Sequence, residues 1–522
     1  MTETAPRDTA LGWWQAQIEQ ENYAGAAEEL PDAAAQKYLR DNALIASTPG
    51  GWGWVVLGPA SPDADSALRQ NYWRLVRVVL RSYAPAAIDR ISAVRLLMGE
   101  ASTPPLLHVT HAASASERKL EVVAGLTIYL RPAPPRTDRQ IVADEMQVDG
   151  ISLPVASPAR VLLSLTVTDI REHRDLVLTW LQSLVLAQPE LEETYERDPR
   201  PVLLARIGHL AEAVGNRRLA EQVGRVANAF QRSRPSRTIT GVGRDLVIPQ
   251  YISAQPSLRE PWLDRLRAKL ARAAEVSAKI VRQSGVDLTP APRATVLRQA
   301  RTAKAEDTYH STTIEGYRIT REHVHVVLEG APLNSPDRAE MERLMALKGY
   351  SQAFERMLQF VTEAPDSVRL TESMVLDLFV ELWGPSVDAE IMTAAELRGW
   401  RKAPVYIRGS AYVPPAPGKV PQLMRVWADT LNEMEMALDG VSRAAIAHWS
   451  FVHVHPFMDG NGRLSRLLMN LVLCSARLPW TIIRAEERAD YFDALEQAHI
   501  REDYAPFARF IATRVRRAQD NG

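Results

Sequence analysis

A short segment bounded by glycines separates two helical stretches in the last quarter of the chain. Residues 442–453 have the periodicity of a helix, and a second apolar helix face follows at the spacing i, i+3, i+4, i+7, formed by Leu464, Leu467, Leu468 and Leu471. Between the two lies Gly460-Asn461-Gly462, whose glycines let a ligand approach the backbone without a Cβ clash. We therefore predict two helices joined by a loop, with the amides and dipole of the second helix favouring an anion.

Charged side chains border this loop. Arg463 and Arg466 are three residues apart, so they share a face of the first helical turn and place two cations above the amides. Asp459 would repel a polyphosphate unless Mg²⁺ lies between them, and Mg²⁺ commonly binds one carboxylate together with phosphate oxygens and water. His455 is the side chain here that can transfer a proton near neutral pH. The residues therefore predict a polyphosphate and Mg²⁺ site beside a proton acceptor.

The run HPFMDGNGRLSR, from His455 to Arg466, resembles the motif HPFx(D/E)GNGRxxR of the Fic family and meets each of its fixed positions. The resemblance implies a mainly α C-terminal helical bundle that moves AMP from the substrate ATP onto a Ser, Thr or Tyr hydroxyl of a protein. It implies that His455 takes the hydroxyl proton and that Asp459 holds Mg²⁺. The implied phosphate ligands are Gly460, Asn461, Gly462, Arg463 and Arg466.

Two flanking regions extend the resemblance. Residues 405–415, called the flap segment below, are predicted to form a β-hairpin with a Gly-Ser turn, like the family's flap that docks a target by strand addition. Its docking residues would be Val405, Tyr406, Ile407, Gly409 and Ser410. Downstream, Tyr491 and His499 fall where Fic proteins line the adenine pocket. The family often has Asn at the place of His499, so the sequence leaves the identity of the base open.

A third segment resembles the family's inhibitory motif, (S/T)xxxE(G/N), in its N-terminal form. Ser311, Glu315 and Gly316 meet the motif at the end of a helical stretch near residues 293–316. The resemblance implies that Glu315 pairs with Arg466, which would remove a γ-phosphate ligand and repel that phosphate. The alternative is that Ser311 and Glu315 form an ordinary i, i+4 pair on a helix surface.

The N-terminal half suggests a different kind of module. We divide the chain into a head at 1–60, a middle region at 61–245 and the Fic region at 255–522, because turn-rich and proline-rich stretches separate them. The head has helical stretches at 11–21, 24–30 and 32–42 and then a turn and a strand at 52–57, which predicts a winged helix. Its recognition helix would expose Gln36, Lys37 and Arg40 to DNA; a plain packing module is the alternative.

The middle region is predicted to be mixed α/β. Strands are expected at 106–110, 126–130 and 150–156, and the last is followed by Ser157 as helix cap and Pro158 at the first helical position. Together with the head, residues 12–220 resemble abortive-infection antitoxins and transcriptional regulators, in which a strand leads into an SPxRxLL helix.

Composition restricts where such a chain works. Hydrophobic residues make up 46% and charged residues 24%, which is typical of globular proteins, and the net charge of −1 gives no overall basic field for nucleic acid or membrane. The single cysteine, Cys474, cannot form an internal disulfide, as expected in a reducing compartment. No secretory signal and no apolar run of about 20 residues is seen. We expect a soluble cytoplasmic protein that does not enter a membrane.

Three functions remain open at this level. The first is an AMP transferase restrained by Glu315. The second is a Fic enzyme with another donor or direction, including UMP or phosphocholine transfer, phosphorylation or removal of AMP. The third is a DNA-binding regulator, or a toxin–antitoxin-like module, whose Fic domain senses nucleotide. Fic proteins of this layout often self-associate, so the resemblance also raises a homo-oligomer.

Overall fold

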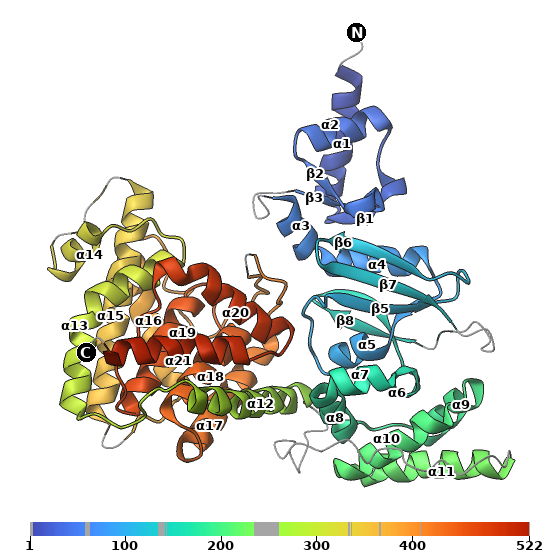
Figure 1. The fold of residues 1–522 in the computed structure, drawn as a ribbon. Helices are drawn as coiled ribbons and strands as arrows, with labels where there is room; N and C mark the ends of the chain where they lie inside the picture. The colour runs from blue at the N-terminus through green and yellow to red at the C-terminus, as the bar shows by residue number, and fades with distance from the viewer. Residues whose placement is uncertain are drawn as a thin grey trace. The chain divides into compact units, whose positions relative to one another are not determined.

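The computed structural model describes residues 4–57, 63–133, 141, 143–233, 260–331, 333, 335, 337–364, 367–407 and 409–520. The chain forms two compact units. The first comprises Met1–Arg265 with Tyr406–Val413, and the second comprises Leu266–Val405 with Pro414–Gly522. Strands occur in the first unit, whereas the described residues of the second form helices and loops (Figure 1). The predicted fold class is confirmed at this coarse level: a mainly helical chain with sheets in its N-terminal part.

The head pairs two helices with a small antiparallel sheet. Its elements are α1 (Thr4–Glu19), β1 (Ala24–Ala26), a 3-10 turn (Ala27–Glu29), α2 (Ala33–Asp41), β2 (Ile45–Ser47), a second 3-10 turn (Pro49–Gly51) and β3 (Gly53–Val56). The strand order is β1-β3-β2. The helix predicted at 24–30 is wrong, because its first residues pair with β3 as β1. Helix α2 begins as predicted, since the Asp32 carboxylate accepts the amides of Ala34 and Ala35 at 2.9 and 3.0 Å.

The middle region is built on a six-stranded mixed sheet. Its elements are α3 (Ala64–Gln70), α4 (Tyr72–Ser82), β4 (Ala86–Ile88), α5 (Arg90–Leu97), β5 (Leu106–His111), β6 (Arg118–Val123), β7 (Leu126–Pro132), β8 (Ala143–Val148), β9 (Ile151–Ala156), α6 (Pro158–Ser164), α7 (Val167–Glu172), α8 (Arg174–Ser183), α9 (Gln188–Arg197), α10 (Pro201–Ala213) and α11 (Arg217–Ser233). The order is β6-β7-β5-β4-β9-β8, with β4–β9 and β5–β7 parallel. The three predicted strands and the Ser157 cap are confirmed.

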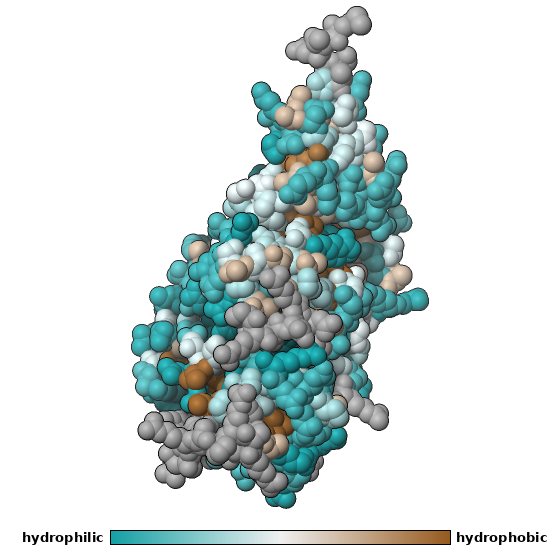
Figure 2. All heavy atoms as spheres, turned by 90° about the vertical axis from the view of Figure 1, so that its right-hand side faces the viewer, coloured by the Kyte–Doolittle hydropathy of each residue, from teal (hydrophilic) through white to brown (hydrophobic). Residues whose placement is uncertain are grey.

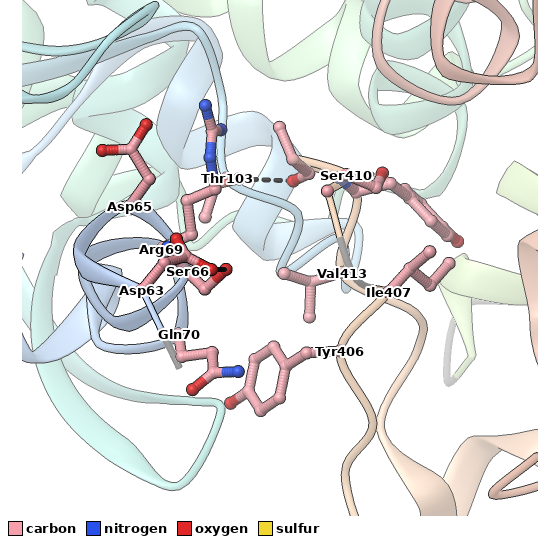
Figure 3. Close-up of a pocket in the computed structure, with 13 residues that line it drawn as sticks. Asp63, Asp65, Ser66, Arg69, Gln70, Thr103, Tyr406, Ile407, Ser410 and Val413 are labelled. Carbon is pink, nitrogen blue, oxygen red and sulfur yellow. Dashed lines mark hydrogen bonds between the residues drawn. The ribbon is translucent and has the colours of Figure 1, made fainter. Parts of the chain in front are cut away.

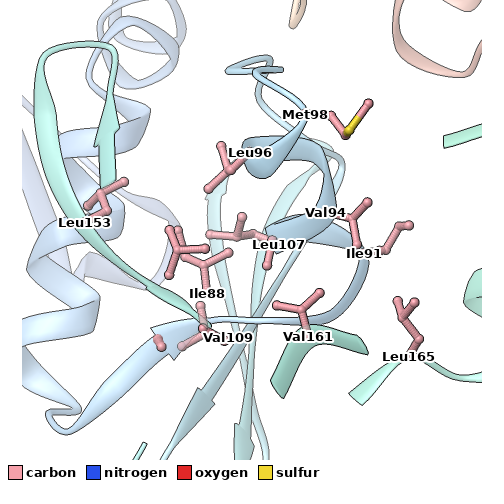
Figure 4. Packing of buried hydrophobic residues seen from close by; sticks show 14 of the residues in the cluster. Ile88, Ile91, Val94, Leu96, Met98, Leu107, Val109, Leu153, Val161 and Leu165 are labelled. Atoms are coloured by element: carbon pink, nitrogen blue, oxygen red, sulfur yellow. The ribbon is translucent and has the colours of Figure 1, made fainter. Parts of the chain in front are cut away.

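A large hydrophobic core runs through the middle region of this unit. Ile88 of β4, Leu107 and Val109 of β5, Leu153 of β9 and Val161 of α6 belong to it (Figure 4). Residues of the head sheet join the same core, which fixes the head to the mixed sheet; they are Ala24, Ala46 and Val55. The boundary predicted near residue 60 stays a prediction, and most of the linker predicted at about 231–260 lies outside the described residues.

The second unit is a helical assembly. Its helices are α12 (Pro261–Gln283), which begins within the first unit, α13 (Arg293–Ile314), α14 (Arg321–Leu328), α15 (Arg338–Glu363), α16 (Glu372–Asp388), α17 (Val420–Glu433), α18 (Gly440–Val454), α19 (Asn461–Ser475), α20 (Arg488–Ile500) and α21 (Ala505–Asp520). Three 3-10 turns lie at Pro417–Lys419, Met434–Met436 and Ala485–Glu487. Nearly every side chain of α18 and α19 is buried, so the loop joining these two helices is held by rigid elements on both sides.

The molecular surface is polar where it is drawn. Hydrophilic side chains prevail on the face in Figure 2, and hydrophobic ones form small separate patches. Within the described ranges, no helix is both long enough and apolar enough to cross a membrane.

Candidate active site

The first functional side chain lies where α18 ends. His455 adopts a left-handed backbone conformation with φ of 52°, and its amide donates to Phe451 O at 2.9 Å. Its ring Nδ1 lies 3.2 Å from Val452 O. Since a carbonyl only accepts, Nδ1 carries the hydrogen and Nε2 keeps its lone pair. Burial lowers the pKa of His455 to about 4, so the ring is neutral at physiological pH and able to accept a proton.

The loop after His455 is braced by Asn461. Its side-chain amide donates to Phe457 O at 2.9 Å and its oxygen accepts the Phe457 amide at 3.0 Å. Gly460 has φ of +88°, and a Cβ there would lie 2.8 Å from Leu382 Cδ2 and 2.9 Å from Trp383 Nε1. The implied role of the Asn461 side chain as a phosphate ligand therefore does not fit this geometry, because both ends of its amide bind the loop backbone.

A carboxylate already lies at the start of α19. A Cβ on Gly462 would fall 2.3 Å from Oε1 of Glu315. The Glu315 carboxylate therefore occupies the space above the first turn, where the free amides and dipole of a helix favour an anion. In this structure Glu315 stands in for an anionic ligand such as a phosphate.

Arg466 holds that carboxylate. Its Nη2 lies 2.6 Å from Glu315 Oε1, while its Nε donates to Ser311 Oγ and Nη2 to Ser311 O, both at 2.8 Å. Burial would lower the pKa of Arg466, but the adjacent Glu315 raises it above its ordinary value. The pair implied by the inhibitory motif is present, and it is not a surface pair of Ser311 with Glu315.

Arg463 has the opposite surroundings. Its side chain is fully buried, yet Nε, Nη1 and Nη2 have no hydrogen-bond partner among the described residues. The guanidinium lies 4.7 Å from the ring centre of Trp383 and 5.4 Å from that of Tyr317. Aromatic faces attract a cation but do not accept its N–H groups as a carboxylate or phosphate does. Arg463 is therefore a buried cation in the first turn of α19, with N–H donors that no described residue accepts.

Asp459 offers one carboxylate to a metal ion. Its side chain is exposed, and Oδ1 accepts the Gly460 amide at 2.5 Å. Over the described ranges, no group of three or more His, Cys, Asp or Glu side chains could hold a metal. A single exposed carboxylate beside an anion site fits Mg²⁺ that arrives with a nucleotide, because phosphates and water can supply the remaining ligands.

A comparison with known protein families matches the part of the chain that contains this site. Residues 370–473 match the Fic/DOC family. This part of the chain is a Fic domain. The sequence is 31% identical over 268 residues to a protein adenylyltransferase Fic of Drosophila grimshawi, covering 50% of this chain and 53% of that protein. For the adenylyltransferase Fic of Nematostella vectensis the identity is 31% over 235 residues, covering 44% and 51%.

The chain thus spans about half the length of the curated relatives it matches. Among solved structures, Fic-1 of C. elegans (residues 134–508) is 20% identical with a TM-score of 0.38, covering 67% of this chain and 92% of that one.

The residues predicted to line an adenine pocket lie on α20 and face the core instead. Tyr491 is buried, and its hydroxyl bonds His448 Nε2 at 2.8 Å and Arg466 Nη1 at 3.5 Å. His499 is 6% exposed, stacked on Trp449 and with Nδ1 3.3 Å from that of His453. The Tyr491 hydroxyl therefore bonds Arg466, and the His499 side chain is packed in the core. Neither side chain is accessible to an adenine base.

The flap segment differs from its prediction. Ser410 N donates to Ile407 O at 3.1 Å across Gly409, whose φ is +76°, which makes the expected turn. The described residues on either side are not paired as strands, so the β-hairpin is wrong. Tyr406 is exposed and Val405 buried.

Several contributors were not found from the sequence. Arg401 donates to His455 O at 2.7 Å, and Trp383 and Tyr317 face Arg463. Tyr317 directly follows the inhibitory motif, which is a usable signal. Trp383 and Arg401 lie more than fifty residues upstream of His455, and no spacing rule links them to it.

Proposed function

We propose that this chain transfers AMP from ATP to a hydroxyl side chain of a protein, and that Glu315 restrains the reaction. The observation that carries the proposal is the contrast within one helical turn. Arg463 is buried with unused donors, and three residues later Arg466 is occupied by a carboxylate of its own chain. A polyphosphate would satisfy the first arginine and compete with Glu315 for the second.

The reaction that fits this geometry is an in-line displacement at the α-phosphorus. The target hydroxyl oxygen forms a bond to that phosphorus, the bond to the bridging oxygen breaks, and pyrophosphate leaves. Nε2 of His455 takes the hydroxyl proton, since Nδ1 is held by Val452 O. Arg463, and Arg466 when released, offset the charge of the leaving group. Mg²⁺ held by Asp459 would neutralise part of the phosphate charge when bound.

The brake follows from electrostatics. With Glu315 on Arg466, a third phosphate would meet a negative charge and lose one guanidinium ligand. ATP could still contact Arg463, but its γ-phosphate would be displaced and the α-phosphorus turned from the line of attack. The relatives named above are protein adenylyltransferases, which supports this direction of transfer.

The test uses ATP labelled at either end. The Glu315→Gly chain is incubated with Mg²⁺ and with α-labelled or γ-labelled ATP, beside Glu315→Gly/His455→Ala as the control. We expect α-label on protein, no γ-label, and loss of α-label without His455. Retained γ-label would indicate phosphorylation, and no label would favour another donor, removal of AMP or nucleotide sensing.

A second function, DNA binding by the head, is favoured by one observation. The order helix, strand, 3-10 turn, helix, strand, 3-10 turn, strand around a three-stranded antiparallel sheet supports a winged helix in which the first 3-10 turn takes the place of the middle helix. On α2, Lys37 and Arg40 are exposed, whereas Gln36 donates to Pro31 O at 2.8 Å. We infer that Lys37 and Arg40 would make phosphate contacts and that Gln36, bonded to the carbonyl before the helix, would contribute less.

A further inference from the structure

The flap segment is bonded by residues of the N-terminal half. Tyr406–Val413 belong to the same compact unit as Met1–Arg265. The Thr103 hydroxyl donates to Ala411 O (Figure 3), and the Ser102 hydroxyl donates to Val413 O at 3.2 Å. Ala411 packs against the hydrophobic core of that unit, and Thr103 is 2% exposed. The contact is therefore a buried, hydrogen-bonded one.

The two acceptors are backbone carbonyls of the segment. Strand addition needs unpaired backbone groups, because main-chain hydrogen bonds provide its affinity. The Ser102 and Thr103 hydroxyls already bond the carbonyls of Val413 and Ala411, which an incoming strand would need.

The other end of the segment is held as well. The Tyr406 hydroxyl donates to the Asp149 carboxylate, which lies in the turn between β8 and β9. A cavity of about 760 Å³ adjoins the segment, lined on one side by residues of α3 and on the other by the flap segment (Figure 3). Two separate loops of the N-terminal half therefore hold the two ends, while the middle borders open space.

We propose that the N-terminal half competes with the target protein for the flap segment, as a second restraint besides Glu315. This inference rests on the proposed AMP transfer. A target with an extended, hydroxyl-bearing segment must displace the Ser102 and Thr103 hydroxyls before its backbone can pair with Ala411 and Val413. The two restraints are independent, since Glu315 controls the position of ATP and the flap contact controls entry of the acceptor.

The contact can be locked by a disulfide. In the Glu315→Gly chain, Thr103→Cys and Ala411→Cys are introduced; the sole natural cysteine, Cys474, is buried and will not compete. Oxidation is followed by intact-mass analysis, and transfer of α-label to casein, a hydroxyl-rich unfolded protein, and to the chain itself is measured before and after reduction. We expect the cross-link to form and total labelling to fall at least about tenfold until reductant restores it.

A second variant weakens the contact that the disulfide would lock. Ser102→Ala/Thr103→Val, again with Glu315→Gly, is compared with the control Ser114→Ala/Ser116→Ala, which removes two exposed hydroxyls of the same unit. We expect faster hydrogen exchange in Tyr406–Val413 and roughly 5- to 30-fold more label than the control, the range for one or two neutral hydrogen bonds.

The outcomes separate the two proposals. Exchange that does not change in the loosened variant, or labelling that is equal in the oxidised and reduced chain, overturns the flap inference while AMP transfer stands. Absence of label from Glu315→Gly in either redox state contradicts AMP transfer itself, and this inference falls with it.

Discussion

At the scale of single residues, the two arginines of the motif have different tasks because they have different neighbours. Arg463 lies against Trp383 and Tyr317 with unused donors, whereas Arg466 is bonded to Ser311 and Glu315. A buried cation without an anionic partner is unfavourable until a ligand supplies one. We therefore assign nucleotide affinity mainly to Arg463 and regulation mainly to Arg466.

Replacement of Arg463 tests this assignment. Arg463→Met keeps much of the volume but removes the charge, so ATP binding should weaken roughly 10- to 100-fold, as expected for a charge-assisted hydrogen bond of about 1.5–3 kcal/mol. The free energy of unfolding should fall by no more than about 1 kcal/mol. Calorimetry and thermal denaturation measure both, with the exposed Arg509→Met as control. An unchanged affinity for ATP contradicts the assignment.

The histidine gives a prediction in pH. The pKa of His455 is lowered to about 4, below the value of about 6.5 for a free histidine. The base of the Glu315→Gly chain is then already neutral at pH 6, and label transfer should fall only as the pH approaches about 4–5. Between pH 6.5 and 4 the unfolded chain binds this proton first, so stability should also decline as pH falls. An acid limb of the rate profile centred near 6.5 would contradict the role.

Residue type and spacing predicted part of this site. The motif singled out His455, Arg463 and Arg466, whose roles stay predictions, and it predicted the pair of Arg466 with Glu315 that the structure contains. Spacing could not show that Asn461 braces its own loop, or that His499 stacks on Trp449, because these depend on which side of a helix faces the core.

At the scale of elements, the proposed brake joins the C-terminal end of α13, which Glu315 caps, to Arg466 of α19. Ser311 lies one turn before Glu315 and bonds the same guanidinium, so the two hold Arg466 together. The helix at 293–316 was predictable from its continuous periodicity. Residues 24–30 were not, since a three-residue strand is fixed by pairing with β3 rather than by local propensity.

Ser311→Ala tests whether the helix acts as a unit. Loss of the hydroxyl leaves Arg466 Nε without an acceptor and should loosen the Glu315 pair, raising AMP transfer about 2- to 10-fold. The matched control is Thr313→Ala, whose hydroxyl bonds Tyr309 O within the same helix. Equal rates for the two variants would show that Ser311 does not contribute to the restraint.

At the scale of the whole molecule, the chain joins a sheet-containing unit to a helical unit that includes the Fic-matching residues 370–473, and Tyr406–Val413 of the flap segment belong to the first unit. No local sequence pattern predicts the contact between Thr103 and Ala411, because the two residues are more than three hundred positions apart. The mixed α/β character of the middle region was predictable from its strands and caps, but its strand order required the structure.

The head supplies a prediction at this scale. Lys37→Ala/Arg40→Ala should weaken binding to the DNA upstream of the chain's own gene and reduce the slope of log affinity against log salt by about 2, one for each phosphate that the variant no longer neutralises. Arg197→Ala, a partly exposed arginine of α9 that pairs with Glu193, is the control. Gel-shift titrations at several salt concentrations measure this, and unchanged binding would leave the head a packing module.

The measurement closest to the central claim is the initial rate of α-label transfer by the natural chain, Glu315→Gly and Glu315→Gln. Removal of the carboxylate should raise the rate roughly 10- to 100-fold, because Arg466 regains its phosphate and a negative charge is lost. Glu315→Gln, which keeps a hydrogen bond to Arg466 without the charge, should lie between the two. If the three rates are equal, then the Glu315–Arg466 pair is structural only and the proposed brake is wrong.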